Sequence, residues 1–234
     1  MRKGFHGPLA RSKNSPPPKF IYTPPPDDGL DILHADGDIL VLSKPANLLS
    51  VAGKQTQHAD CLETRALKEY PTARIVHRLD RGTSGIFIMA LNPASHRHLG
   101  LQFEKRKTEK TYIAEVTGIV KENEGHIDLP MRTDWYNRPK QMIDTYFGRE
   151  AITDWKVISR GEKTTRMELY PKTGRSHQLR VHLQELGHPI LGDSFYAPRH
   201  AVEMSNRLLL HAETLDLFHP MDGERVSFTS PCPF

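Results

Sequence analysis

The length, composition and charge of the chain exclude several classes of protein. Its 234 residues are 37% hydrophobic and 26% charged, so the chain can bury a core and is neither fibrous nor disordered throughout. No run approaches the roughly 18 consecutive apolar residues of a membrane helix, and the N-terminus lacks the apolar core of a secretory signal. We therefore expect a cytoplasmic protein without a membrane role, whose net charge of +4 favours polyanionic partners.

The two cysteines exclude two further kinds of scaffold. Cys61 and Cys232 lie far apart, and neither belongs to a CxxC pair or a Cys/His cluster. This spacing argues against both a disulfide framework and a structural zinc site.

Residues 1–28 predict a flexible basic arm. The segment is Pro-rich and carries five lysines and arginines with no acid before Asp27, so it cannot bury enough apolar area to offset its chain entropy. Such an arm either contacts phosphates without sequence preference or serves only as a solubilising tail. At roughly 150 residues per domain, the remaining residues, 29–234, predict a single domain.

The first half of this domain predicts short strands and two helices. An Asp-Gly turn at residues 36–38 indicates a hairpin, and Pro71 ends the first helix. The expected elements are strands at 32–35, 39–42, 75–76, 86–89 and 110–117, and helices at 62–70 and 93–106.

The second half predicts more strands and one further helix. Strands are expected at 154–159, 165–170, 207–217 and 225–228, and a helix at 176–186, capped by Ser176 and ended by Gly187. Because strands and helices do not alternate regularly, the pattern predicts an α+β domain.

The first segment that can carry chemistry reads IVHRLDRGTSGIFIM, from Ile75 to Met89. Asp80 lies between two arginines in a Gly/Ser/Thr turn, and apolar strands flank that turn on both sides. This is how a reactive carboxylate is displayed on a rigid scaffold, so Asp80 is the candidate nucleophile. The structural alternative is an Asx-turn or helix-cap residue.

The second segment reads GRSHQLRVHLQELG, from Gly174 to Gly187. As a helix it buries its leucines and gathers His177, Arg180 and Gln184 on another face, where they can meet a phosphate or a carboxylate. The histidine spacing of five and six residues differs from the i, i+4 pair of a helical zinc site, so we expect no metal.

The third segment is the strand around Tyr112, which alternation places on one face with Ala114 and Val116. The structural alternative is a core tyrosine. Lysines and arginines surround this strand at 105–107, 110, 132, 138 and 140, as single-stranded nucleic-acid sites often require.

Together these segments resemble the RluA family of RNA pseudouridine synthases. The family signature, HRLD followed by two variable residues and TSG, stands complete at residues 77–85. The block at 174–196, Lys110 with Tyr112, and LLLHA at 208–212 also match. The first block departs from the family at Ser43 and Asn47, where the family has Asn and Gly; Asn is the best substitute for Gly at a left-handed position, so the turn can survive.

This resemblance implies a pseudouridine synthase fold, with a mixed, mainly antiparallel sheet, flanking helices and a central cleft. It implies that a uridine in RNA is isomerised without cofactor or metal, and that Asp80 is essential. Asp80 either attacks or stabilises charge at C1′, or accepts the C2′ proton. Arg180 should pair with Asp80 and keep it ionised, Tyr112 should stack on the target base, and Arg78 should fill the gap that the flipped uridine leaves. Leu210 is expected to pack against the site.

The segment at residues 134–141 resembles the short RluA-like subgroup, whose members act on a tRNA anticodon stem-loop and a 23S rRNA hairpin. Too few residues precede the first strand for the S4-type RNA-binding domain of other members, and we expect a monomer. The main alternative is a catalytically silent RNA-binding module of the same fold. A metal-dependent nuclease or hydrolase is a second rival, but it needs a ligand set that the sequence lacks.

Overall fold

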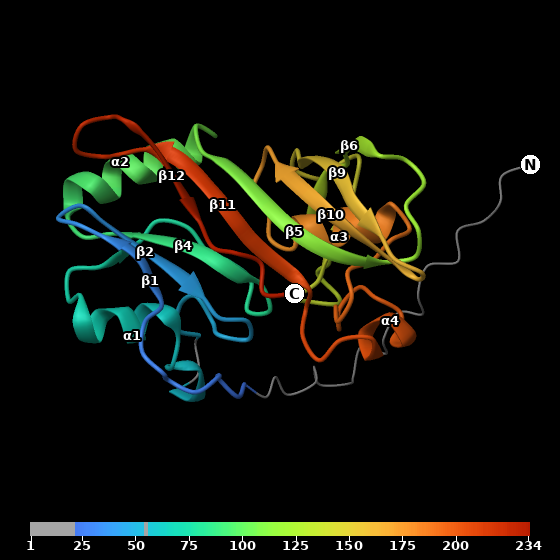
Figure 1. The fold of residues 1–234 in the computed structure, drawn as a ribbon, viewed down its shortest axis with the longest axis horizontal. Coiled ribbons are helices and arrows are strands. Elements are labelled where there is room, and N and C mark those ends of the chain that lie inside the picture. The colour runs from blue at the N-terminus through green and yellow to red at the C-terminus, as the bar shows by residue number, and fades with distance from the viewer. Residues whose placement is uncertain (1–21, 54–55) are drawn as a thin grey trace, which may run out of the picture.

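The computed structural model describes residues 22–53 and 56–234, which form two strand-rich halves joined by one continuous sheet (Figure 1). Within these residues ten strands pair in the order β1-β2-β4-β11-β5-β10-β9-β6, with β3 beside β4 and β12 beside β11. All pairs are antiparallel except β4 with β11. The expected α+β class is therefore confirmed.

The strands of this sheet are β1 (Ile32–Ala35), β2 (Ile39–Lys44), β3 (Arg74–Ile75), β4 (Ser84–Ala90), β5 (Glu109–Thr117), β6 (Glu124–Asp128), β9 (Ile152–Arg160), β10 (Thr164–Pro171), β11 (Leu210–Phe218) and β12 (Arg225–Thr229). The helices are η1 (Thr56–His58), α1 (Leu62–Glu69), α2 (Pro93–Glu104), α3 (Gln178–Glu185) and α4 (Arg199–Glu203). The expected strands and helices are all present, while β6, η1 and α4 were not expected. None of the helices in the described part of the chain is long and apolar enough to cross a membrane.

The N-terminal half of the sheet is buried on both faces. Leu40 and Leu42 of β2 pack in the cluster that contains Leu62 of α1, while Ile39 packs in the cluster that contains Leu99 of α2. Because successive side chains of a strand point to opposite faces, β2 needs apolar residues at nearly every position. This explains the unbroken apolar run that the sequence shows there.

Helix α3 packs on the C-terminal half of the sheet, where Leu179 and Leu183 join the core cluster of β5, β9 and β10. The expected Ser176 cap is wrong, because the helix begins at Gln178 and His177 occupies the N-cap position in the left-handed region, at φ 56°. The Gln178 side chain closes this turn instead, accepting hydrogen bonds from the Arg175 amide at 3.0 Å and from a nearby threonine hydroxyl.

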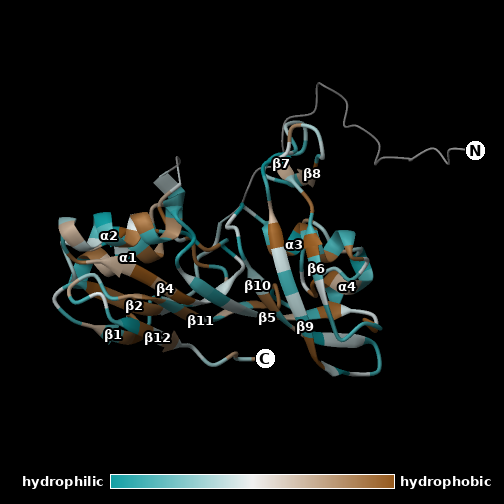
Figure 2. Cartoon of the chain, turned by 90° about the horizontal axis from the view of Figure 1, so that it is seen from above, coloured by the Kyte–Doolittle hydropathy of each residue, from teal (hydrophilic) through white to brown (hydrophobic). Residues whose placement is uncertain are grey.

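A small separate hairpin, β7 (Met131–Thr133) and β8 (Gln141–Ile143), projects from the body beside α3 (Figure 2). The sequence pattern did not predict it, because its strands have three residues each and carry little apolar alternation. We call the segment from Met131 to Arg149 the β7–β8 hairpin.

Residues 22–28, which the sequence assigns to the arm, contact the domain. The Tyr22 hydroxyl donates to the Asp60 carbonyl at 2.9 Å, and the buried Arg65 guanidinium donates to the carbonyls of Pro25 and Pro26. Pro25 and Pro26 lie outside the strands, so no ladder uses their carbonyls. The rest of the expected arm lies outside the described residues.

A substitution at Gly85 tests the packing at the junction between the two halves. It lies opposite Ala212 in the parallel β4–β11 pair at φ 106°, and a Cβ there would stand 2.1 Å from the Ala212 carbonyl oxygen. We expect Gly85→Ala to lower the free energy of unfolding by about 2–5 kcal/mol, from backbone strain plus overpacking. Gly187, at φ 89° with open space around it, is the matched control, and Gly187→Ala should cost only about 1–2 kcal/mol. Equal losses in urea unfolding would contradict this assignment.

Candidate active site

The three sequence motifs meet in a groove between the two halves of the molecule. The groove has a volume of about 1080 Å³, and a recess of about 100 Å³ lies against Asp80 at its floor. The structure thus brings Arg78, Asp80 and Tyr112 together with the start of α3. Both cavities share the lining residues Arg78, Leu79, Asp80, Lys110, Tyr112, Thr173, Gly174, Arg175 and His177.

Asp80 lies in a turn that its neighbours hold through the backbone. The Thr83 amide donates to the Asp80 carbonyl at 3.1 Å, which closes the turn. One residue earlier, the Ser50 hydroxyl donates to the Leu79 carbonyl at 2.7 Å and accepts from the Leu79 amide at 3.1 Å. The carboxylate itself is 25% exposed and open to the recess.

Lys44 anchors the same turn from inside the protein. Its ammonium donates to the carbonyls of Pro45, Leu48 and Arg81 at 2.9, 2.8 and 3.2 Å, and its side chain is fully buried. Burial lowers the pKa of Lys44 to about 7, and the nearby Asp80 carboxylate opposes this shift. Three carbonyls match the three donors of the ammonium form, which therefore joins the loop after β2 to the Asp80 turn.

Arg180 connects Asp80 to a second carboxylate. Its Nη1 lies 3.4 Å from Asp80 Oδ2, as expected, but its Nε and Nη2 form a bidentate pair with Asp193 at 2.8 and 2.7 Å. Asp193 Oδ1 also accepts the amides of Phe195 and Tyr196. Burial alone would lower the pKa of Arg180, but the hydrogen bonds and charge of Asp193 outweigh it and raise that pKa. Arg180 is therefore a fixed cation.

His177 faces Asp80 through its other ring nitrogen. The Gln141 amide donates to the Tyr196 hydroxyl at 2.8 Å, so that hydroxyl can donate its own hydrogen to His177 Nδ1 at 2.7 Å. Burial lowers the pKa of His177 although Asp80 opposes it, which favours the neutral ring. We assign the ring hydrogen to Nε2, which points toward Asp80 Oδ2 at 3.9 Å.

The remaining predicted residues occupy different depths of the groove. Tyr112 lines the recess, and burial strongly raises the pKa of its hydroxyl. Leu210 lines the recess beside it, so the expected packing is confirmed. Arg78 is exposed on the groove wall, one residue before the buried Leu79.

The groove wall carries far more positive than negative charge. Arg78, Lys110 and Arg175 also line the recess, and burial lowers the pKa of Lys110. Such a surface suits an extended polyanion. The basic residues that line the groove are Arg78, Arg106, Lys110, Arg138, Arg149, Lys172 and Arg175.

Sequence reasoning missed Asp193, Tyr196 and the role of His177. Asp193 and Tyr196 lie in the matched block, but no local spacing connects Asp193 with Arg180, thirteen residues earlier. The sequence signal that could have found Asp193 is that it is an acidic residue within residues 174–196, the block that matches the family.

His77, in the same motif, gives the fold a pH dependence. Its ring stacks between Phe87 and Phe103, and its Nε2 accepts the Ile88 amide at 3.0 Å. Burial lowers the pKa of His77 to about 3, so below about pH 6.5 the unfolded chain binds a proton that the native state excludes. Stability should therefore fall as pH drops from about 6.5 toward 3, by up to about 1.4 kcal/mol per pH unit.

We expect His77→Gln to flatten this part of the profile in urea unfolding measured from pH 7 to 4. The exposed His200 gives the matched control, His200→Gln, which should keep the slope of the original protein. Identical slopes for all three proteins would refute the role of His77.

Comparisons with known proteins agree with this geometry. A family model described as RNA pseudouridylate synthase matches residues 38–185. The dual-specificity RNA pseudouridine synthase RluA of Escherichia coli (strain K12) is 47% identical over 214 residues, which cover 91% of this chain and 98% of that protein. The Vibrio cholerae protein of the same name is 45% identical, over 91% of this chain and 87% of its own length.

A solved structure, human RNA Pseudouridylate Synthase Domain Containing 1, superposes with a TM-score of 0.76 at 30% identity, covering 91% of this chain and 87% of that one. The expected pseudouridine synthase fold is thereby confirmed, and so is the resemblance drawn from the motifs. The match spans the HRLD turn, the strand of Tyr112 and helix α3. The chain belongs to the RNA pseudouridylate synthase family.

Proposed function

We propose that the chain converts a uridine in an RNA hairpin loop to pseudouridine, with Asp80 as the essential carboxylate. Family membership makes the chain an RNA pseudouridine synthase, an isomerase, rather than a catalytically silent module or a metal-dependent nuclease. The observation that carries the role of Asp80 is its position at the floor of a cationic groove, 3.4 Å from the fixed Arg180 guanidinium.

The reaction breaks the N1–C1′ bond, reorients the uracil and joins C5 to C1′, after which C5 loses its proton and N1 gains one. An electron-poor C1′ needs a carboxylate, so Asp80 attacks it or stabilises its charge; in the alternative course it removes the C2′ proton. Uracil delocalises its negative charge over two carbonyl groups and therefore needs no strong general acid. Arg180 donates to Asp80 Oδ2 at 3.4 Å and His177 Nε2 lies 3.9 Å from the same oxygen, while Asp80 lines the recess in which the uridine would bind.

Tyr112 and Arg78 receive roles in handling the base. Tyr112 presents a half-buried aromatic ring at the recess, where it stacks on the target base, while the exposed Arg78 fills the space that the flipped uridine leaves. Extruding a base costs a few kcal/mol and costs least where pairing is already absent, which favours a loop uridine.

The name of the bacterial relatives, dual-specificity, supports two RNA substrates for this chain as well. The resemblance of residues 134–141 to the short subgroup makes these the anticodon stem-loop of tRNA and a hairpin of 23S rRNA. We propose that a monomer acts on both in the cytoplasm, with residues 29–234 as the catalytic domain and the N-terminal arm as an auxiliary RNA contact.

Asp80→Asn tests the reaction. The amide keeps the size of the side chain but loses the charge, so conversion should fall by at least about 10³-fold, while RNA affinity stays within a few-fold. Tritium release from C5-labelled uridine in a stem-loop RNA measures conversion, because the isomerisation leaves the mass unchanged. Asp222→Asn, at an exposed position, is the control. Full activity of Asp80→Asn would sink the mechanism.

Asp193→Asn tests how Arg180 is held. The variant leaves Arg180 buried with a weaker partner, so we expect a loss of about 3–5 kcal/mol in stability and a fall of about 10–100-fold in the single-turnover rate. The exposed Arg199–Glu203 pair supplies the control, since Glu203→Gln should cost less than about 1 kcal/mol and leave the rate unchanged. An unchanged rate and pH profile in the folded Asp193→Asn protein would refute the positioning role.

A further inference from the structure

The β7–β8 hairpin presents two aromatic pairs on two turns of the same design. Asp134 Oδ1 accepts the amides of Tyr136 and Asn137 at 3.2 Å, and this turn carries Trp135 and Tyr136. At the other end of the hairpin, Asp144 Oδ1 accepts the amides of the residues two and three positions later at 2.9 Å, and that turn carries Tyr146 and Phe147.

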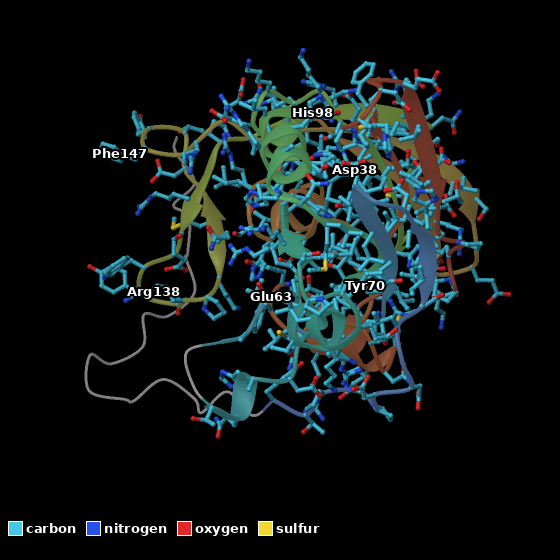
Figure 3. The ribbon with its side chains drawn as sticks, turned by 90° about the vertical axis from the view of Figure 1, so that its left-hand side faces the viewer. Asp38, Glu63, Tyr70, His98, Arg138 and Phe147 are labelled. Carbon is cyan, nitrogen blue, oxygen red and sulfur yellow. The ribbon has the colours of Figure 1, made fainter. Side chains whose placement is uncertain are left out.

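All four aromatic side chains stand in solvent. Trp135, Tyr136, Tyr146 and Phe147 are 63%, 85%, 91% and 81% exposed, far more than large aromatic residues need to be. Figure 3 shows the two turns, marked by Arg138 and Phe147, reaching away from the body of the protein. Side chains this exposed bury little apolar area and contribute little to the stability of the fold. Their exposure therefore indicates a surface that binds a ligand.

The charges around the two turns select the kind of ligand. Both aspartates are engaged within the hairpin, Asp134 by its turn and Asp144 by its turn and by Arg132. Arg132, Arg138 and Arg149 are exposed, and the Arg138 guanidinium lies 3.7 Å over the Trp135 ring. Cations interleaved with exposed aromatic rings favour nucleic acid, because bases stack on the rings while phosphates meet the cations.

The hairpin is also continuous with the catalytic groove. Thr133, Arg138, Pro139, Gln141 and Arg149 form one wall of that groove. RNA that delivers a uridine to Asp80 must therefore pass this wall. Nucleotides that flank the target then lie within reach of the two turns.

We propose that the aromatic pairs 135–136 and 146–147 are stacking sites for unpaired nucleotides outside the catalytic groove. The proposal rests on the function proposed above and extends it to substrate selection: an RNA with splayed bases on both sides of the target uridine binds more tightly than one whose neighbours are paired. Because the Asp-capped turns fix the backbone that carries the rings before binding, less ordering entropy opposes the stacking.

The test compares RNA affinity across matched variants of the full chain. The double variants Trp135→Ala/Tyr136→Ala and Tyr146→Ala/Phe147→Ala should each raise the Kd for a stem-loop RNA by about 5- to 150-fold per base that loses its stacking partner. Tyr146→Phe keeps the ring and should therefore bind RNA nearly as tightly as the original protein, in contrast to the Tyr146→Ala/Phe147→Ala variant. Met221→Ala, at an exposed apolar position on the β11–β12 turn, should bind like the original protein.

A second readout reports stacking directly. 2-Aminopurine placed at single loop positions should lose fluorescence on binding the original protein and regain it with the alanine variants. Unchanged Kd values and unchanged quenching in both double variants would overturn the proposal. So would normal RNA binding together with a change in self-association by sedimentation, which would assign the rings to a contact between copies of the chain.

The stacking sites and the proposed function can be tested independently. Binding and quenching can be measured with the Asp80→Asn variant, in which no conversion is expected. If the original protein binds stem-loop RNA through the rings but releases no tritium, the proposed function fails and the stacking sites stand.

Discussion

The arrangement around Asp80 depends on one buried ion pair, that between Arg180 and Asp193. Two charges can be buried only when their hydrogen bonds are satisfied. Here Asp193 accepts hydrogen bonds from Nε and Nη2 of Arg180 and from two backbone amides. One guanidinium nitrogen, Nη1, is left for Asp80, at the longer distance of 3.4 Å. Asp80 is thus contacted by a cation whose other donors bind Asp193, which is consistent with the role proposed for its carboxylate.

The turn that carries Asp80 does not rely on the Asp80 side chain for its shape. Lys44 and Ser50 hold the carbonyls on either side of it, at Arg81 and Leu79. Lys44 is buried at the end of β2, so the apolar N-terminal half of the sheet fixes this turn, while α3 in the other half supplies Arg180. The site therefore exists only when the two halves pack together across β4, β11 and β5.

Features that depend on residues adjacent in the chain could be predicted from the sequence. The expectation that Asn47 occupies a left-handed position is confirmed by its φ of 67°. The strands with strong apolar runs were also predictable. Ser176 was misplaced because Gln178 closes the turn, and Asp193 went unassigned because its partner lies on another element. A contact between residues on different elements produces no characteristic spacing in the sequence, so it could not be predicted.

The hydrogen bond from Gln141 to Tyr196 connects the hairpin with the catalytic centre. A phenol hydroxyl has one hydrogen to give, and because the Gln141 amide supplies a donor, that hydrogen can go to His177. The tautomer of His177, and hence the N–H that faces Asp80, thus depends on where β8 lies. Under the proposed function, an RNA strand that binds against the hairpin contacts the same network, which ends at His177 Nε2, 3.9 Å from Asp80. Tyr196 therefore links the β7–β8 hairpin to His177, because its hydroxyl contacts both.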